Sequence, residues 1–169
     1  GTTNFILSNI QKYHSDYFKQ CVSIFKTNTP YFFDYSEQSL FESYLLKKDI
    51  KYYVLFNEKN IIVGSGGYGY NYDKKTVDFC WGMIDFKCQN NGFGTNLLNY
   101  RVLQIEIDFH KTNISLNTTQ HTFKFYKKFG FQVEKITKNY YRKGLHRYDM
   151  IKFHKGIEEK KGKGKKQAG

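Results

Sequence analysis

The residues best suited to chemistry form a short glycine-containing loop between a run of strand-forming residues and a long helical pattern: Gln89-Asn90-Asn91-Gly92-Phe93-Gly94-Thr95. The first N–H groups of a helix have no acceptor within the helix, and together with the helix dipole they attract anions. Gly92 and Gly94 let the backbone approach phosphate oxygens because they carry no Cβ, and Gln89 can hold the loop by bonding its backbone. The pattern predicts a phosphate-binding loop, with an ordinary strand-to-helix turn as the alternative.

A second glycine cluster, residues 64–69, matches the pattern G-x-G-x-x-G. A dinucleotide-binding loop of that pattern has to open a helix, because the helix N-terminus binds the pyrophosphate. Here the residues that follow are typical of a turn: Tyr70-Asn71-Tyr72-Asp73-Lys74-Lys75. We therefore predict that these glycines lie in a strand, where another backbone or a ligand packs closely against them.

The elements that must position these loops follow from hydrophobic periodicity. Strands are predicted at residues 3–10, 51–56, 61–70, 76–86, 113–118, 131–138 and 147–153. Helices are predicted at residues 13–26, 37–47, 93–110 and 121–129. Two pairs near the second helix have the spacing of a capping box: Asp34 with Glu37, and Ser39 with Glu42. In the third helix, four apolar residues share one face: Leu98, Val102, Ile105 and Phe109.

This order of elements predicts an α/β (α+β) fold: a single domain with a mixed, mostly antiparallel sheet and helices on both faces. An antiparallel meander leads into a β-α-β crossover, and the domain is expected to span residues 1–155. Residues 156–169 are expected to form a basic, disordered tail, because Lys-Gly repetition with almost no apolar residues cannot offset the entropy of ordering.

The formal net charge of the chain is +12, which suits an anionic ligand without saying whether that ligand is a nucleotide, a nucleic acid or a membrane surface. No apolar run approaches the roughly 20 residues of a membrane-spanning helix, and no secretory signal pattern opens the sequence, so no membrane partner is expected. Cys21, Cys80 and Cys88 match no zinc-binding spacing. We expect buried reduced thiols, no metal site and a cytoplasmic protein.

Two segments together carry a resemblance to a known family. The pattern Q-x-x-G-x-G after a strand resembles the acyl-CoA loop of the GNAT superfamily of N-acetyltransferases. About thirty residues further on, a second segment is similar to the F-Y-x-K-x-G-F segment of the same superfamily: Phe125-Tyr126-Lys127-Lys128-Phe129-Gly130-Phe131. The resemblance covers residues 4–153 and is weakest in the first fifty. It implies a GNAT-like acyl-CoA N-acyltransferase fold.

The resemblance also implies how acetyl-CoA is held. The strand before the loop would be interrupted by a bulge, so that its freed backbone groups bind the pantetheine arm and one N–H polarises the thioester carbonyl. The loop itself would hold the pyrophosphate. The cofactor-binding residues implied in this way are Gly82, Met83, Ile84, Gln89, Asn90, Asn91, Gly92, Phe93, Gly94, Thr95, Asn117, Thr119 and Tyr126.

Two catalytic residues are implied. Tyr126 matches the tyrosine that protonates the departing CoA thiolate, and Asp78 lies where many members of the superfamily carry an acidic general base; a half-buried aromatic and a solvated carboxylate are the structural alternatives. His121, His146 or a chain of water molecules are the other candidates for the base. Where the superfamily often has Asn seven residues before the tyrosine, this chain has Thr119, whose hydroxyl can replace part of that contact.

The function implied is transfer of an acetyl group from acetyl-CoA to a primary amine, on a small molecule or a peptide, by direct attack in a ternary complex. The acceptor would lie against residues 28–35 and 140–149, and the enzyme would be a monomer or a homodimer. One alternative is a CoA-binding sensor or scaffold without catalysis. Another is a nucleic-acid-binding protein that uses residues 140–143 and the tail, which is less favoured because the basic residues are scattered.

Overall fold

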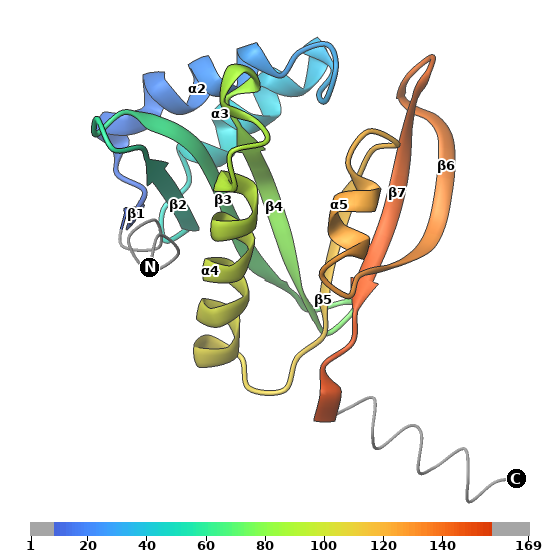
Figure 1. Ribbon diagram of the computed structural model, residues 1–169. Helices are drawn as coiled ribbons and strands as arrows, with labels where there is room; N and C mark the ends of the chain where they lie inside the picture. Colours follow the sequence, from blue (N-terminus) through green and yellow to red (C-terminus); the bar gives the residue numbers. More distant parts are fainter. Residues whose placement is uncertain (1–8, 157–169) are drawn as a thin grey trace, which may run out of the picture. The chain divides into compact units, whose positions relative to one another are not determined.

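The computed structural model describes residues 9–156 (Figure 1). Most of the strand predicted at residues 3–10 and nearly all of the predicted tail lie outside this range, and the first strand described is β1 (Ile10–Lys12). The chain divides into two compact units, each described by itself below. Of the described residues, unit 1 comprises 9–69 and 79–104, and unit 2 comprises 70–78 and 105–156.

The strands form one seven-stranded mixed sheet in the order β1-β2-β3-β4-β5-β7-β6. After β1 the strands are β2 (Lys51–Phe56), β3 (Ile62–Asn71), β4 (Thr76–Ile84), β5 (Ile114–Thr118), β6 (Gln132–Arg142) and β7 (Leu145–Lys152). The pairs β1–β2, β2–β3, β5–β7 and β6–β7 are antiparallel, and β4 pairs with β5 in parallel. The predicted fold class, a mixed and mostly antiparallel sheet with helices, is confirmed.

In unit 1, two helices cover one face of the sheet (Figure 1): α2 (Phe18–Thr27) and α3 (Gln38–Leu45). Each follows a single 3₁₀ turn, η1 (Ser15–Tyr17) or η2 (Tyr35–Glu37). Their buried residues form one cluster with alternate residues of β2, namely Cys21, Val22, Ile24, Phe25, Phe41, Leu45, Tyr52 and Val54, together with Ile62 and Met83. Burial of this apolar area is the main favourable contribution to the stability of the unit.

The start of the second helix is fixed by a capping box, as predicted for Asp34 and Glu37. The Asp34 carboxylate accepts from the Ser36 N–H (3.0 Å), and the Asp34 N–H donates to the Glu37 carboxylate (2.8 Å). The second predicted capping box was wrong, because Ser39 lies inside α3, whose N-cap is Glu37. Asp34 has already ended the preceding loop, so the helix begins before Ser39 can act as a cap.

The helix α4 (Phe93–Asp108) contributes most of its length to unit 1. Its Tyr100 ring packs on Tyr53 (centroids 5.1 Å apart), a β2 residue that alternates with Tyr52 and Val54, so α4 covers the face opposite α2 and α3. The predicted apolar face was partly wrong. The buried positions of α4 are Asn96, Leu97, Leu98, Arg101 and Ile105, whereas Val102 and Phe109 are only half-buried.

In unit 2, β5, β6 and β7 accompany the short helix α5 (Phe123–Lys127). The Phe123 ring stacks on Tyr148 of β7 (centroids 4.4 Å apart), and the Tyr126 ring meets Phe131 edge to face (5.7 Å). The final hairpin is longer than predicted, because β6 continues to Arg142 and β7 begins at Leu145. Most of residues 140–149, whose aromatic and basic side chains were expected to lie against the acceptor in a connection, are therefore strand residues.

Candidate functional site

The predicted phosphate loop lies in unit 1 between η3 (Phe86–Cys88) and α4. Asn90 and Gly92 both have left-handed backbones, with φ of 66° and 81°, a conformation that Asn and Gly adopt most readily. The Asn96 N–H donates to the Gly92 carbonyl (3.1 Å), so the N–H groups of residues 93–95 precede the first helical hydrogen bond. These three donors have no acceptor within α4 and can bind an anion.

The loop is held by side chains of its own and by one helix. Gln89 was expected to bond the backbone of the loop itself. Instead its amide donates to the Asn28 side chain (3.2 Å) and to the Ile84 carbonyl (3.5 Å), so it ties the loop to other elements. Asn91 bonds the backbone of the loop, because its amide donates to the carbonyls of Cys88 (3.1 Å) and Gln89 (3.3 Å).

Asn28 is a positioning residue that sequence reasoning missed. It caps the C-terminus of α2, is 2% exposed, and donates from one amide nitrogen to the carbonyls of Ile24 and Ile84 (both 2.9 Å). It therefore links α2, the end of β4 and the Gln89 side chain. An Asn after the last periodic residue of a helix indicates a C-cap, but its second bond, to Ile84, depends on tertiary structure.

The strand before the loop loses its regular conformation where the resemblance implies a bulge. Trp81 has a left-handed backbone (φ 47°) in the middle of β4, immediately before the predicted stretch 82–84. The Trp81 ring packs against Phe41 (centroids 5.1 Å apart), and its carbonyl accepts from the Tyr52 hydroxyl (2.8 Å). These contacts hold an irregularity that an L-residue with a large side chain rarely adopts.

The glycines at 64–69 are buried strand residues up to Gly67, as predicted, and they make room for an unexpected cation. Arg101 of α4 is 3% exposed, and its guanidinium donates to the Gly67 carbonyl (3.3 Å) and lies over the Phe79 ring (4.0 Å to the centroid). A Cβ added at Gly66 would lie 3.1 Å from the guanidinium carbon. The buried Nε has no hydrogen-bond partner among residues 9–156.

Asp78, the predicted base, lies in unit 2 at the start of β4. Its carboxylate accepts from Asn71 (3.0 Å), from the Thr76 hydroxyl (2.9 Å) and from the Ser115 hydroxyl. Asp78 and Ser115 are also partners in the parallel β4–β5 pair. The carboxylate therefore joins two strands, in addition to any role in chemistry.

Three further predicted site residues lie in unit 2: Asn117 and Thr119, which were expected to contact the pantetheine arm, and Tyr126. Asn117 is on β5 and accepts from the Tyr141 hydroxyl (2.6 Å). Thr119 is buried, and its hydroxyl accepts from the His121 N–H (3.3 Å) while its carbonyl accepts from the N–H groups of Thr122 and Phe123 (both 3.1 Å). Thr119 thus starts the turn that leads into α5.

The two histidines named as alternative bases lie together in unit 2. Burial, followed by the positive charges of Arg142 and His146, lowers the pKa of His121 below its ordinary value of 6.5. The His146 ring accepts from the Asn139 N–H at Nδ1 (2.9 Å). The neutral form of His146 therefore carries its proton on Nε2, where it can act as a donor.

The three cysteines lie in unit 1. Burial raises the pKa of the Cys21 thiol to about 12, so this thiol stays protonated. The Cys80 thiol donates to the Tyr44 hydroxyl (3.2 Å). All three cysteines are free, with Cys21 buried and the other two half-buried.

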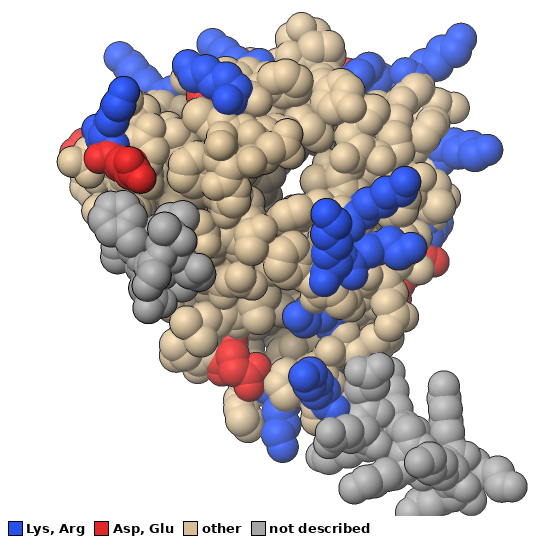
Figure 2. All heavy atoms as spheres, viewed as in Figure 1, with Lys and Arg blue, Asp and Glu red and all other residues tan. Residues whose placement is uncertain are grey.

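The described residues contain no helix long and apolar enough to cross a membrane. Between residues 9 and 156 no three His, Cys, Asp or Glu side chains are grouped so that they could hold a metal ion. Lys and Arg are far more frequent than Asp and Glu on the face drawn in Figure 2.

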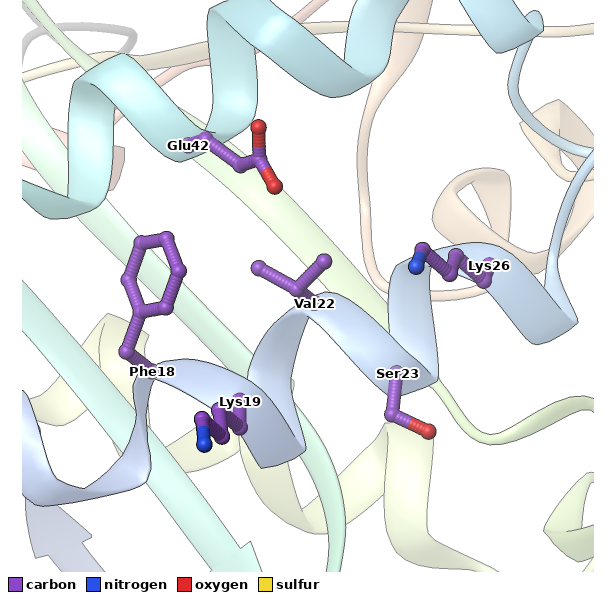
Figure 3. A pocket seen from close by; sticks show the side chains of 6 residues that line it. All are labelled: Phe18, Lys19, Val22, Ser23, Lys26 and Glu42. Atoms are coloured by element: carbon purple, nitrogen blue, oxygen red, sulfur yellow. The ribbon is translucent and has the colours of Figure 1, made fainter.

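A shallow hollow of about 310 Å³ lies in unit 1 between α2 and α3. Figure 3 shows its lining side chains, of which Glu42 comes from α3 and the others from α2: Phe18, Lys19, Val22, Ser23 and Lys26. None of the predicted site residues lines this hollow, and it takes no part in the function proposed below.

The mixed sheet with helices on both faces is the fold of an acyl-CoA N-acyltransferase. Residues 17–153 match the family model described as an acetyltransferase (GNAT) domain, and the chain belongs to the GNAT acetyltransferase family. Acetyl transfer is the reaction of this family. A search of curated proteins found no match.

Solved structures share the fold at low sequence identity. Ard1 from Thermoplasma volcanium is 18% identical with a TM-score of 0.71, over 85% of this chain and 95% of that one. The ribosomal-protein-S18-alanine N-acetyltransferase from Escherichia coli is 14% identical with a TM-score of 0.70, over 86% and 92%. An aminoglycoside 6'-N-acetyltransferase complexed with coenzyme A is 15% identical with a TM-score of 0.66, over 85% and 96%. Such identities establish a common fold and not a common acceptor.

Proposed function

We propose that this protein transfers the acetyl group of acetyl-CoA to a primary amine by direct attack in a ternary complex. The observation that carries the proposal is the loop at the N-terminus of α4, where the left-handed residues Asn90 and Gly92 precede three helix N–H groups without intrahelical acceptors. A pyrophosphate supplies the negative oxygens that such donors require. Membership of the GNAT family supports acyl-CoA as the ligand.

The pantetheine arm is assigned to the irregular part of β4 and to the end of β5. The left-handed Trp81 interrupts the strand before Gly82, Met83 and Ile84, which supports a stretch with backbone groups available to the substrate. At the end of β5, Asn117 and Thr119 carry the polar side chains proposed to contact the arm.

In the proposed reaction the acceptor nitrogen attacks the thioester carbonyl carbon. A C–N bond forms, the C–S bond breaks, and the thiolate takes a proton from the Tyr126 hydroxyl. The nitrogen gives up a proton to Asp78, either directly or through water. Three donors fix the position of the Asp78 carboxylate.

We also propose that the enzyme works in the cytoplasm with reduced cysteines and without a metal. The raised pKa of Cys21, about 12, supports an unreactive thiol. Monomer and homodimer remain the two proposed oligomeric states.

Calorimetry with acetyl-CoA tests the loop, and thiol release over a panel of amines tests the reaction. Gly94→Val places a branched side chain in the first turn of α4, and we expect acetyl-CoA affinity to fall about ten-fold or more because the backbone can no longer approach the phosphates. Gly69→Val is the matched control, since a Cβ there meets nothing within 4 Å. Equal affinity of the two variants would refute the loop assignment, and binding without transfer to any amine would support a CoA sensor instead.

A further inference from the structure

Arg101 places a positive charge in the interior of unit 1, directly against the irregular part of β4. Its side chain comes from α4 and is buried. A Cβ added at Gly82 would lie 3.0 Å from Nη2 and 3.2 Å from Nη1, and one added at Gly66 would lie 3.1 Å from the guanidinium carbon. Because neither position carries a side chain, the guanidinium packs on the backbone of β3 and β4.

This charge has little compensation among residues 9–156. The guanidinium donates one hydrogen bond, to the Gly67 carbonyl (3.3 Å), Nε has no acceptor, and no carboxylate pairs with Arg101. The Phe79 ring, whose centroid is 4.0 Å from the guanidinium carbon, compensates the charge only in part. An apolar side chain of the same length would fill the space without the cost of burying a cation. Packing therefore accounts for the size of this side chain but not for its charge.

The backbone beside Arg101 is also held from the opposite face of the sheet. The Tyr52 hydroxyl donates to the Trp81 carbonyl (2.8 Å) and accepts from the Ser65 hydroxyl (2.8 Å), because a hydroxyl has one proton and a carbonyl has none to give. Tyr52 and Ser65 are both fully buried. Trp81 is the left-handed residue of β4, and its ring packs on Phe41. These contacts should keep the irregular backbone in place when the charge of Arg101 is removed.

We propose that Arg101 is a positioning residue for acetyl transfer, whose charge acts through the Gly82 backbone on the thioester carbonyl of acetyl-CoA. The inference rests on the proposed function, in which residues 82–84 receive the thioester and one of their N–H groups polarises its carbonyl. When the acceptor nitrogen attacks, negative charge develops on the thioester oxygen, and a fixed cation nearby stabilises it. Arg101 needs no contact with the substrate for this role, because a charge acts at longer range in a medium of low dielectric constant.

The carbon-13 resonance of acetyl-CoA labelled at its acetyl carbonyl tests the proposal without an acceptor. Polarisation of a carbonyl moves this resonance downfield, so the displacement on binding reports the field at the thioester. We expect Arg101→Met, which keeps the length and removes the charge, to show less than about half of the wild-type displacement. Arg101→Lys keeps the charge and should retain most of it. Equal displacements in the wild type and Arg101→Met, or a displacement in Arg101→Lys as small as in Arg101→Met, would overturn the proposal.

Kinetics separate the charge of Arg101 from its packing. With an amine found by thiol release, Arg101→Met should lower kcat about ten-fold or more while the KM for acetyl-CoA changes little, since the loop at the N-terminus of α4 keeps its donors. Gln104→Met is the matched control, because it introduces the same side chain one turn further along α4 and changes no charge; it should retain the wild-type kcat. A wild-type kcat in folded Arg101→Met would contradict the proposal.

The wild type alone keeps the proposal falsifiable if Arg101→Met does not fold. Bound acetyl-CoA whose carbonyl resonance is not displaced downfield would overturn the inference without any variant. Absence of acetyl-CoA binding by calorimetry would instead contradict the proposed function. A displaced resonance that Arg101→Met reduces would support the inference even where the amine panel gives no transfer.

Discussion

The guanidinium of Arg101 lies against Gly82, so closely that a Cβ added to this glycine would come within 3.0 Å of Nη2. Arg101 is 3% exposed and therefore has no free path into solvent that would make room for a larger residue. Gly82 follows the left-handed Trp81 in β4. The guanidinium from α4 therefore fills the space beside the irregular part of β4 in unit 1.

Gly82→Val should destabilise the protein by about 1–3 kcal/mol, the usual cost of overpacking a dense interior. Urea unfolding followed by circular dichroism measures this difference. Gly69→Val, in the open part of β3, is the control and should unfold within about 0.5 kcal/mol of the wild type. Equal losses for the two variants would show that the Arg101 contact does not limit residue 82.

Arg101→Met tests how the buried charge affects stability. No carboxylate among residues 9–156 pairs with Arg101, which has one hydrogen bond to a carbonyl. Burying such a charge costs free energy, so an apolar residue of similar length should leave the free energy of unfolding unchanged or raise it by up to about 2 kcal/mol. Arg101→Ala should instead lose about 2–5 kcal/mol through the cavity it leaves. A loss above about 3 kcal/mol in Arg101→Met would mean that the charge is compensated.

The burial of Arg101 could not be predicted from the sequence, although the helix that carries it could. Helical periodicity predicted α4 and its start at the glycine loop, because both depend on neighbouring residues. It placed Val102 on the buried face and overlooked Arg101, since a charged residue is buried only where a distant strand offers space. Gly66 and Gly82 provide that space, and their distance from Arg101 in sequence hides the relationship.

In other parts of the fold too, short sequence patterns predicted the features that depend on neighbouring residues and missed those that depend on distant residues. The capping box at Asp34 and the hairpin between β2 and β3 were predicted correctly from short patterns. The ends of β6 and β7 were placed too far from the turn, because Gln120 holds the turn from outside the hairpin. A clamp of this kind leaves no signal in the local sequence.

Asp78→Asn separates the structural and the catalytic role of this carboxylate. Asn71, Thr76 and Ser115 donate to the two carboxylate oxygens of Asp78. The change replaces one of these oxygens by an NH₂ group, which cannot accept, and we expect a loss of about 1–3 kcal/mol in unfolding free energy. If Asp78 is the base, kcat should also fall by about 10²-fold or more. Ser115→Ala is the control, because it removes one donor and keeps the carboxylate. Similar kcat values for both variants would assign Asp78 to structure alone.

His121 should make stability depend on pH. Burial and the charges of Arg142 and His146 lower its pKa in the folded state. Below the ordinary histidine pKa, the unfolded chain therefore binds more protons than the folded one, so stability falls as the pH falls through 6.5 toward the folded-state pKa. His121→Gln should flatten the melting temperature between about pH 7 and about pH 5. His110→Gln leaves His121 in place and should retain the slope, and an unchanged slope in His121→Gln would contradict the assignment.

Tyr126→Phe removes a hydroxyl and keeps a ring that packs against Phe125 (centroids 5.3 Å apart) and Phe131 (5.7 Å). Because the packing is preserved, melting temperature and acetyl-CoA affinity should stay close to those of the wild type. If the hydroxyl protonates the departing thiolate, kcat should fall near the lower end of the range of about 10²- to 10⁴-fold for general acids, since a CoA thiolate leaves with only partial help. Turnover has to be measured with an acceptor for which the chemical step limits the rate. Wild-type kcat in a folded Tyr126→Phe protein would show that Tyr126 is a packing residue, and the proton for the thiolate would then come from solvent or from another donor.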